Sequence, residues 1–497
     1  MALGNLTKGA LISYVSIVLN ILISFIYTPW MINQIGVSDY GLYTLATSFI
    51  SYFILDMGLS TSVSRFISKY RAENNEKKIS ELLGITFKVY LFIDLIILVV
   101  LTIIYIFIGE LFDGLTTDEI DKFKILYCIV GSFSLMTFVL KPIDGAMMSY
   151  EFFVENRLFD MAFKVGSVLL IVVLLLFNGN VYTLVFANSF TALLVNFCKF
   201  ITFKYKSGVQ IKYLYFNFKE LKNIFSFSFW IFLLNLASRF KLSLIPSILG
   251  MESNVSEIAI FSLALTIEAI VYLLTSALSG LFLPMVTRLV TNNTKDLILD
   301  LMIKVGRLQF MMFLFIFLGF VVFGESFINL WVGKTFSETY MIVILLIAIN
   351  LISTTQSIAF DMVYADNRVK IISIANFIIS FIGLFISFLI AHKYGAIGCS
   401  ICTACSMFLF HLFLNFYYYR KMNINIFSFF KECHFSIIKK SFFILLLCIY
   451  FIYNLKITNW FTLFLYVFLF VLLYAINTYK VTMNSYEKGL VKRILKI

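Results

Sequence analysis

Residues 27–60 read YTPWMINQIGVSDYGLYTLATSFISYFILDMGLS and hold the end of one long apolar helix, a short turn and much of the next helix. In the first predicted helix, 9–32, Asn20 and several serines recur every three or four residues, so the polar side chains share one face. The second predicted helix, 42–65, carries Asp56 on a similar face. A carboxylate near the middle of a bilayer is costly unless it meets a polar cavity or a partner. We therefore expect both helices to span a membrane and to line an aqueous interior.

The serines of these helices have a second interpretation, because small polar residues also allow membrane helices to pack closely. Packing alone accounts well for the serines. It accounts less well for Asp56, because that side chain is charged.

The composition is typical of a polytopic membrane protein. Hydrophobic residues make up 61% of the 497 residues, charged residues make up 13%, and the mean hydropathy is +0.96. These values exclude a soluble globular protein. Runs of roughly 17 to 25 apolar residues predict an all-α protein with about fourteen transmembrane helices. The predicted spans are 9–32, 42–65, 85–109, 123–146, 158–177, 181–203, 225–249, 258–283, 308–324, 341–363, 371–391, 397–419, 441–456 and 460–477.

The distribution of Lys and Arg predicts the orientation, because positively charged loops stay on the cytoplasmic side. Most of the basic residues fall on one side of the predicted membrane if the N-terminus and the C-terminus are both cytoplasmic. The net charge of +12 therefore needs no nucleic-acid partner to explain it. The first span has no small-residue cleavage site and contains Pro29, so we interpret it as a retained helix and not a signal peptide.

Two six-helix halves resemble each other weakly. Asn235 and Pro246 of the predicted helix 225–249 correspond in spacing to Asn20 and Pro29 of the predicted helix 9–32. Both copies start on the cytoplasmic side, which predicts parallel repeats with a binding site between them near mid-membrane. The predicted parts are an N-terminal lobe 1–203, a basic cytoplasmic linker 204–224, a C-terminal lobe 225–420, and two further helices with a basic tail, 421–497.

The linker interleaves lysines with tyrosines and phenylalanines, as does the segment 420–440. This composition suits a segment that lies on an anionic inner leaflet, and a solvated basic linker explains it equally well. Seven cysteines, mostly inside spans, argue against a disulfide framework. Cys399, Cys402 and Cys405 spread across a helical face without a fourth ligand nearby, so we expect no metal site there.

Polar side chains inside the spans are the candidate functional residues. Asn235, Arg239 and Ser243 share one helix face, whereas Lys241 points among apolar neighbours. Glu268, Asp361 and Lys141 lie on comparable polar stripes of three other predicted helices, 258–283, 341–363 and 123–146. Asp160 and Lys164 are four residues apart, which favours a pair with each other.

Catalysis has little support in the sequence. The predicted outside loops are short, and Gly333-Lys334-Thr335 lacks the earlier glycine of a phosphate-binding loop. We therefore expect a transporter and no enzyme, driven by an ion gradient or by the membrane potential.

The N-terminal signature resembles that of the Wzx-like polysaccharide transporters, the O-antigen flippases of the multidrug/oligosaccharidyl-lipid/polysaccharide exporter superfamily. The residues that carry the resemblance are Thr28-Pro29, Gly36-Val37-Ser38-Asp39-Tyr40-Gly41-Leu42-Tyr43, Asp56-Met57-Gly58-Leu59, Arg65, Asn367-Arg368-Val369-Lys370 and Tyr394-Gly395-Ala396-Ile397-Gly398. The resemblance implies a V-shaped pair of six-helix lobes with two added helices in a bacterial cytoplasmic membrane.

The resemblance also implies a function. The expected activity is the flipping of undecaprenyl-pyrophosphate-linked oligosaccharide to the outer leaflet for O-antigen or capsule synthesis, with lipids and a polysaccharide polymerase as partners. Arg239, Lys141, Asn20 and Asn235 would line the cargo site, and Arg239 would hold the pyrophosphate or pair internally with Asp56 or Glu268. By their polar stripes and their depth in the predicted spans, and not through the resemblance, Asp56, Glu268 and Asp361 are the carboxylates expected to bind H⁺ or Na⁺ or to face the lumen, with no other cofactor. A lipid II flippase and a multidrug/cation antiporter of the same fold are the alternatives.

Overall fold

The computed structural model describes residues 2–53, 59–177, 179–213, 217–275, 296–366, 368–454 and 457–495, together with 215, 286 and 289. Within these residues the regular secondary structure is helical and contains no strand. The expected all-α class is therefore confirmed. Asp56 lies outside the described residues, as does the side chain of Asn20.

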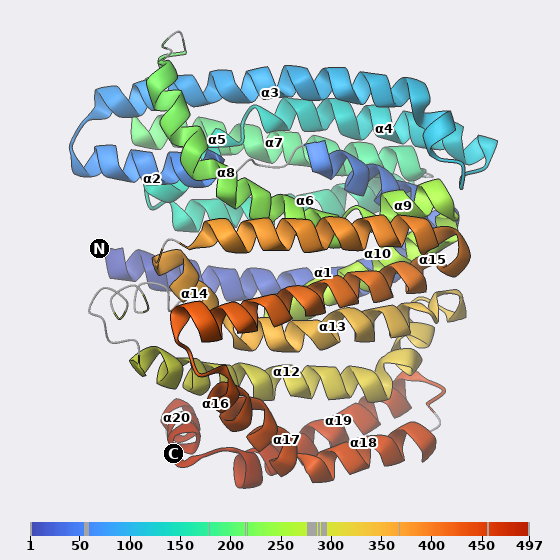
Figure 1. Cartoon of the computed structure of the whole chain (residues 1–497). Coiled ribbons are helices and arrows are strands. Elements are labelled where there is room, and N and C mark those ends of the chain that lie inside the picture. The colour runs from blue at the N-terminus through green and yellow to red at the C-terminus, as the bar shows by residue number, and fades with distance from the viewer. Residues whose placement is uncertain are drawn as a thin grey trace. The chain divides into compact units, whose positions relative to one another are not determined.

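Up to residue 275, the described residues form ten helices, which Figure 1 shows from blue to green. They are α1 (Ala2–Phe53), α2 (Leu59–Ala72), α3 (Glu76–Leu111), α4 (Thr117–Phe138), α5 (Pro142–Ser149), α6 (Phe153–Leu176), α7 (Val181–Ser207), α8 (Phe218–Lys241), α9 (Ile245–Glu252) and α10 (Val255–Thr275).

The second part continues with long helices and short helical turns. They are α12 (Asp296–Trp331), a 3₁₀ turn (Lys334–Phe336), α13 (Thr339–Thr355), α14 (Ser357–Ala365), α15 (Val369–Met422), α16 (Ile426–Phe430), a π-helical turn (Lys431–Phe435), α17 (Ser436–Lys440), α18 (Phe442–Asn454), α19 (Trp460–Asn477), a second π-helical turn (Thr478–Thr482) and α20 (Ser485–Leu495).

Nine helices in the described part are long and apolar enough to cross a membrane, or up to twelve if each of three bent pairs counts as one span. A multi-pass membrane protein is therefore confirmed, and the count of about fourteen remains a prediction. Two of the long helices contain breaks that the sequence had placed between spans. Gly36 interrupts α1 at φ 84°, and Gly395 interrupts α15 at φ 50°. Positive φ costs glycine little, which is why these turns fall at glycines.

Capping side chains decide where several helices begin. Asn75 accepts a hydrogen bond from the backbone of Lys78, so α3 begins well before the apolar run predicted at 85–109. Thr116 and Glu119 form a capping box at α4, and Asn459 caps α19. The apolar run thus marks the part of a helix that is suited to lipid, whereas the capping residue marks where the helix begins.

The chain divides into two compact units. The first unit comprises Met1–Ser262 with Asn376–Ala396, and the second comprises Leu263–Ala375 with Ile397–Ile497. In the first unit α4 packs beside both α3 and α7 (Figure 1). In the second, α12 packs against α13 and α19, where Phe315 stacks on Phe470 at 5.7 Å between ring centroids. Nothing in these units tests the lobe and linker boundaries drawn from the sequence, which stay predictions.

Candidate functional site

Arg239 lies at a break between two helices of the first unit. The chain bends by 42° between Ser228–Lys241 and Ile245–Glu252, and Pro246, which lacks a backbone donor, stands in the first turn of α9. The carbonyl of Arg239 accepts hydrogen bonds from the backbone N–H groups of Ser243 and Leu244, at 3.0 and 3.1 Å. Its guanidinium donates to Ser243 Oγ over 3.3 Å. The two side chains therefore share a face, as predicted, and Arg239 is half-buried at an interrupted helix.

Lys241 has a partner that sequence reasoning missed. Its ammonium donates to Oδ1 of Asn376 over 2.6 Å, joining the end of α8 to α15 within the first unit. Asn376 is buried and stands within the apolar run 371–391. That lone amide was the available signal, because a polar side chain in an apolar span needs a partner.

Lys141 belongs to a charged cluster of the first unit. Its ammonium lies 3.9 Å from Asp144, and Lys199 lies 3.2 Å from Asp144 and 3.1 Å from Asp160. Arg157 lies 3.6 Å from Asp160. The expected pair between Asp160 and Lys164 is wrong, because Lys199 approaches Asp160 from α7. A neighbour on the same helix was visible in the sequence, whereas one from another helix was not.

Glu268 and Asp361 are buried carboxylates of the second unit. Glu268 on α10 accepts a hydrogen bond from Nδ2 of Asn350 on α13 over 2.5 Å. Asp361 lies on α14, beyond a 56° bend between α13 and α14. Its Oδ2 atom is buried and accepts no hydrogen bond within the described part of the chain. Both carboxylates thus lie inside protein, a setting that marks functional sites in membrane proteins.

The remaining predicted residues are less constrained. Asn235 is exposed on α8, one turn before Arg239. The backbone of Asn20 lies in α1, and Asp56 falls outside the described residues. The proposed binding roles of all seven predicted site residues are not tested by these positions. Within the described residues no three His, Cys, Asp or Glu side chains are grouped to hold a metal ion.

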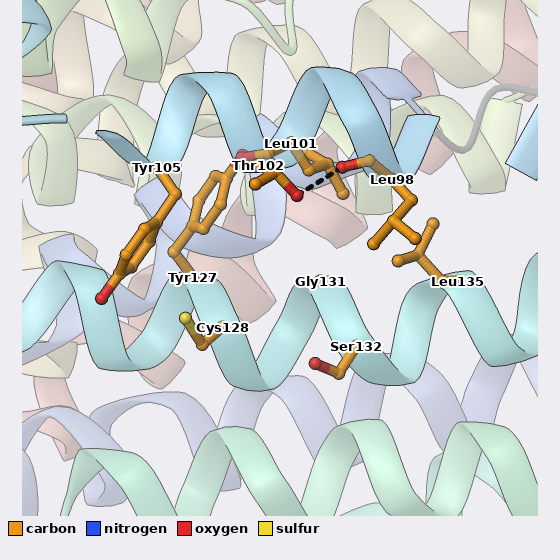
Figure 2. Close-up of a pocket in the computed structure, with 9 residues that line it drawn as sticks. All are labelled: Leu98, Leu101, Thr102, Tyr105, Tyr127, Cys128, Gly131, Ser132 and Leu135. Carbon is orange, nitrogen blue, oxygen red and sulfur yellow. Dashed lines mark hydrogen bonds between the residues drawn. The ribbon is translucent and has the colours of Figure 1, made fainter. Parts of the chain in front are cut away.

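A groove between α3 and α4 has a different character. Its volume is about 210 Å³, and Figure 2 shows Tyr105 and Tyr127 at one end and Leu98 and Leu135 at the other. Gly131 and Ser132 lie between them on α4. The Tyr127 hydroxyl donates to the carbonyl of Leu101 over 2.9 Å. No Asp, Glu, Lys or Arg lines this groove, so it offers no charge to a polar cargo.

Comparisons with known proteins place this architecture. The family model described as "Polysaccharide biosynthesis protein" matches residues 6–290. Among solved structures, the lipid II flippase MurJ in an inward closed conformation superposes with a TM-score of 0.72 and 17% identity, covering 98% of this chain and 99% of that one. An inward-facing multidrug resistance MATE family transporter of the MOP superfamily superposes with a TM-score of 0.63 and 13% identity, covering 84% of this chain and 98% of that one. A MOP superfamily transporter from Pyrococcus furiosus superposes with a TM-score of 0.55 and 13% identity, covering 84% of this chain and 95% of that one. The search of curated proteins found no match.

Proposed function

Because the chain belongs to the polysaccharide biosynthesis protein family, we propose that it flips an undecaprenyl-pyrophosphate-linked oligosaccharide from the cytoplasmic to the outer leaflet of a bacterial cytoplasmic membrane. The fold shared with MurJ and MATE transporters supports a transport role for a lipid-linked cargo. The flipped unit would feed a polymerase that assembles O-antigen or capsule. Both termini are proposed to be cytoplasmic, on the distribution of Lys and Arg.

The observation that carries this proposal is the half-buried Arg239 at the break between α8 and α9. A guanidinium stays charged when it is desolvated, and its planar fork of donors matches two phosphate oxygens at once. The hydrogen bond from Arg239 to Ser243 uses one of the two terminal nitrogens of the guanidinium. An arginine in a membrane-spanning segment costs at least about 2.5–3.5 kcal/mol by insertion scales. A pyrophosphate that arrives with each cargo would offset this cost.

The test replaces Arg239 with Lys, Gln and Ala and measures flipping of lipid-linked oligosaccharide in reconstituted vesicles. Gln and Ala should abolish flipping while the protein remains folded, and Lys should restore only part of it, because an ammonium cannot bind two oxygens in one plane. Arg420→Gln, at an exposed arginine on α15, is the matched control and should flip normally. Normal flipping by Arg239→Gln would overturn the role of Arg239.

If Arg239→Gln fails to fold and the added change Asp56→Asn restores the folded protein, an internal ion pair between Arg239 and Asp56 is favoured instead. A parallel set of vesicles carrying lipid II separates the two flippase candidates.

The membrane potential favours outward movement of the anionic cargo by about 2.3 kcal/mol per charge per 100 mV. H⁺ or Na⁺ would then be needed only to return the empty carrier.

A second candidate function is a cation antiporter of the same fold. The buried carboxylates Glu268 and Asp361 favour it, because an organic cation would need anionic partners inside the membrane. Efflux of a fluorescent organic cation from the same vesicles, abolished by Asp361→Asn, would support this alternative.

A further inference from the structure

A second polar site lies within the first unit, in a cavity of about 600 Å³. Residues of α2, α5, α6 and α7 line it. Its size falls in the range of about 300–1,000 Å³ that is typical of ligand pockets. Gly145 allows α5 to pack closely against α2 at one wall of the cavity, because a Cβ atom at this position would lie 2.1 Å from the carbonyl oxygen of Ser60 on α2. The cavity is therefore a built feature of the packing of α5 on α2.

The charged groups of the lining balance one another. Arg65 and Lys199 are the cations, and Asp144 and Asp160 are the anions. Lys199 is buried, and each of its two carboxylate contacts is close to 3 Å, at 3.2 and 3.1 Å. The carboxylates keep further acceptor capacity, because an ionised carboxylate offers about four lone-pair sites. The lining thus presents donors and acceptors together and carries no net formal charge.

Hydroxyl groups and one amide complete the lining. Ser60, Ser64 and Ser68 follow each other at intervals of four residues on α2, which places them on one face towards the cavity. Asn156 at the start of α6 has a buried Oδ1 atom that accepts no hydrogen bond within the described part of the chain. A buried hydrogen-bond acceptor that meets no donor lowers the stability of the folded protein by about 1–3 kcal/mol. A ligand that donates to Oδ1 would recover this loss.

This chemistry excludes several ligand classes. A polyanion would meet two carboxylates, and the cations beside them, Lys199, Lys141 and Arg157, are already paired with those carboxylates. A metal ion would have to displace Lys199 from both of them. A neutral polyhydroxylated molecule can donate to the carboxylates and to Asn156 and can accept from Arg65 and Lys199.

The geometry points to this cavity as a subsite for the saccharide headgroup of the cargo, within one unit of the chain. This inference rests on the proposed function. The lining residues stand at the ends of spans that the sequence predicts to be cytoplasmic, which is the side where the lipid-linked cargo would be loaded. The subsite would select for glycan, and the pyrophosphate would bind elsewhere.

The test uses purified full-length protein and free oligosaccharide released by mild acid hydrolysis from the lipid-linked pool of the source cells. Ser64→Trp should fill the cavity and weaken binding at least tenfold by calorimetry. Asn156→Leu should weaken it about tenfold, because it removes one hydrogen bond to the ligand. The Leu variant removes no described bond from Oδ1, so it should stay folded. Ser132→Trp, in the groove of Figure 2, is the matched control and should bind as the unaltered protein does.

Failure of the subsite and failure of the proposed function give different results. If the unaltered protein flips the lipid-linked cargo but does not bind free oligosaccharide, the subsite is overturned and the flippase stands. Unchanged binding by both Ser64→Trp and Asn156→Leu also overturns it. If the protein binds oligosaccharide through this cavity but flips no lipid-linked cargo, the proposed function fails and the binding site stands.

Discussion

Lys241 Nζ lies 2.6 Å from Oδ1 of Asn376, so a lysine at the end of α8 is hydrogen-bonded to a buried amide of α15. The two residues are 135 positions apart in the chain. A hydrogen bond to a charged group contributes about 1.5–3 kcal/mol. This contact therefore fastens α15 to α8 inside the first unit.

Replacing Asn376 with Leu should lower the melting temperature of the detergent-solubilised protein by removing the acceptor of this bond. We expect a loss of about 1.5–3 kcal/mol, and Lys241→Met with Asn376→Leu should lose less than the sum of the single changes. Lys393→Met, at an exposed lysine of α15, is the control. Additive losses in the double variant would show that the two side chains are not coupled.

Arg307 should hold the C-terminal helix in place. Its Nε lies 2.5 Å from Oε1 of Glu487 and its Nη2 lies 3.1 Å from Oε2, with both side chains buried. The guanidinium also donates to the carbonyls of Glu432 and Thr482. Breaking a buried pair on one side costs about 3–5 kcal/mol, so Arg307→Gln should release α20 from α12.

Limited trypsin digestion measures this release through the rate of cleavage at Lys488. Lys334→Gln serves as the control, because this lysine is exposed and follows the far end of α12. Equal cleavage of Arg307→Gln and the unaltered protein would show that the ion pair does not hold α20.

Gly395 should not tolerate a side chain. Its φ is +50°, and an added Cβ would lie 2.6 Å from Oε2 of Glu257, which accepts a hydrogen bond from Ala396 N over 2.7 Å. Gly395→Ala combines that clash with a backbone strain of about 1–3 kcal/mol. Its monodisperse fraction after detergent extraction should fall, whereas Gly489→Ala in α20 meets open space and should be neutral or stabilising. A Gly395→Ala protein as stable as Gly489→Ala would contradict the account.

Asp361 should couple transport to an ion. Its Oδ2 is buried without a hydrogen bond in the described part of the chain, so a proton or Na⁺ is the natural way to stabilise the carboxylate. Asp361→Asn should remove the pH or Na⁺ dependence of flipping in vesicles. Glu268→Gln tests the second candidate, whose carboxylate already accepts from Asn350. If both variants keep the ion and pH dependence of the unaltered protein, these carboxylates have no coupling role.

The sequence alone predicted the helices, because their determinants are local. Apolar runs of sufficient length predict spans, and Gly36 and Gly395 mark breaks because a positive φ suits glycine. The shared face of Arg239 and Ser243 also followed from a spacing of four residues. Sequence motifs, most of them in the first eighty residues, indicated the family, and the family model matches residues 6–290.

Tertiary structure alone decided which polar groups of different helices meet. Lys199 reaches Asp144 and Asp160 from another helix, and Lys241 reaches Asn376 across 135 residues. Helical periodicity reports the face on which a side chain lies, but it does not report which helix packs against that face. The strength of a polar contact depends on atoms within about 3 Å, and that separation is fixed only when distant helices pack together.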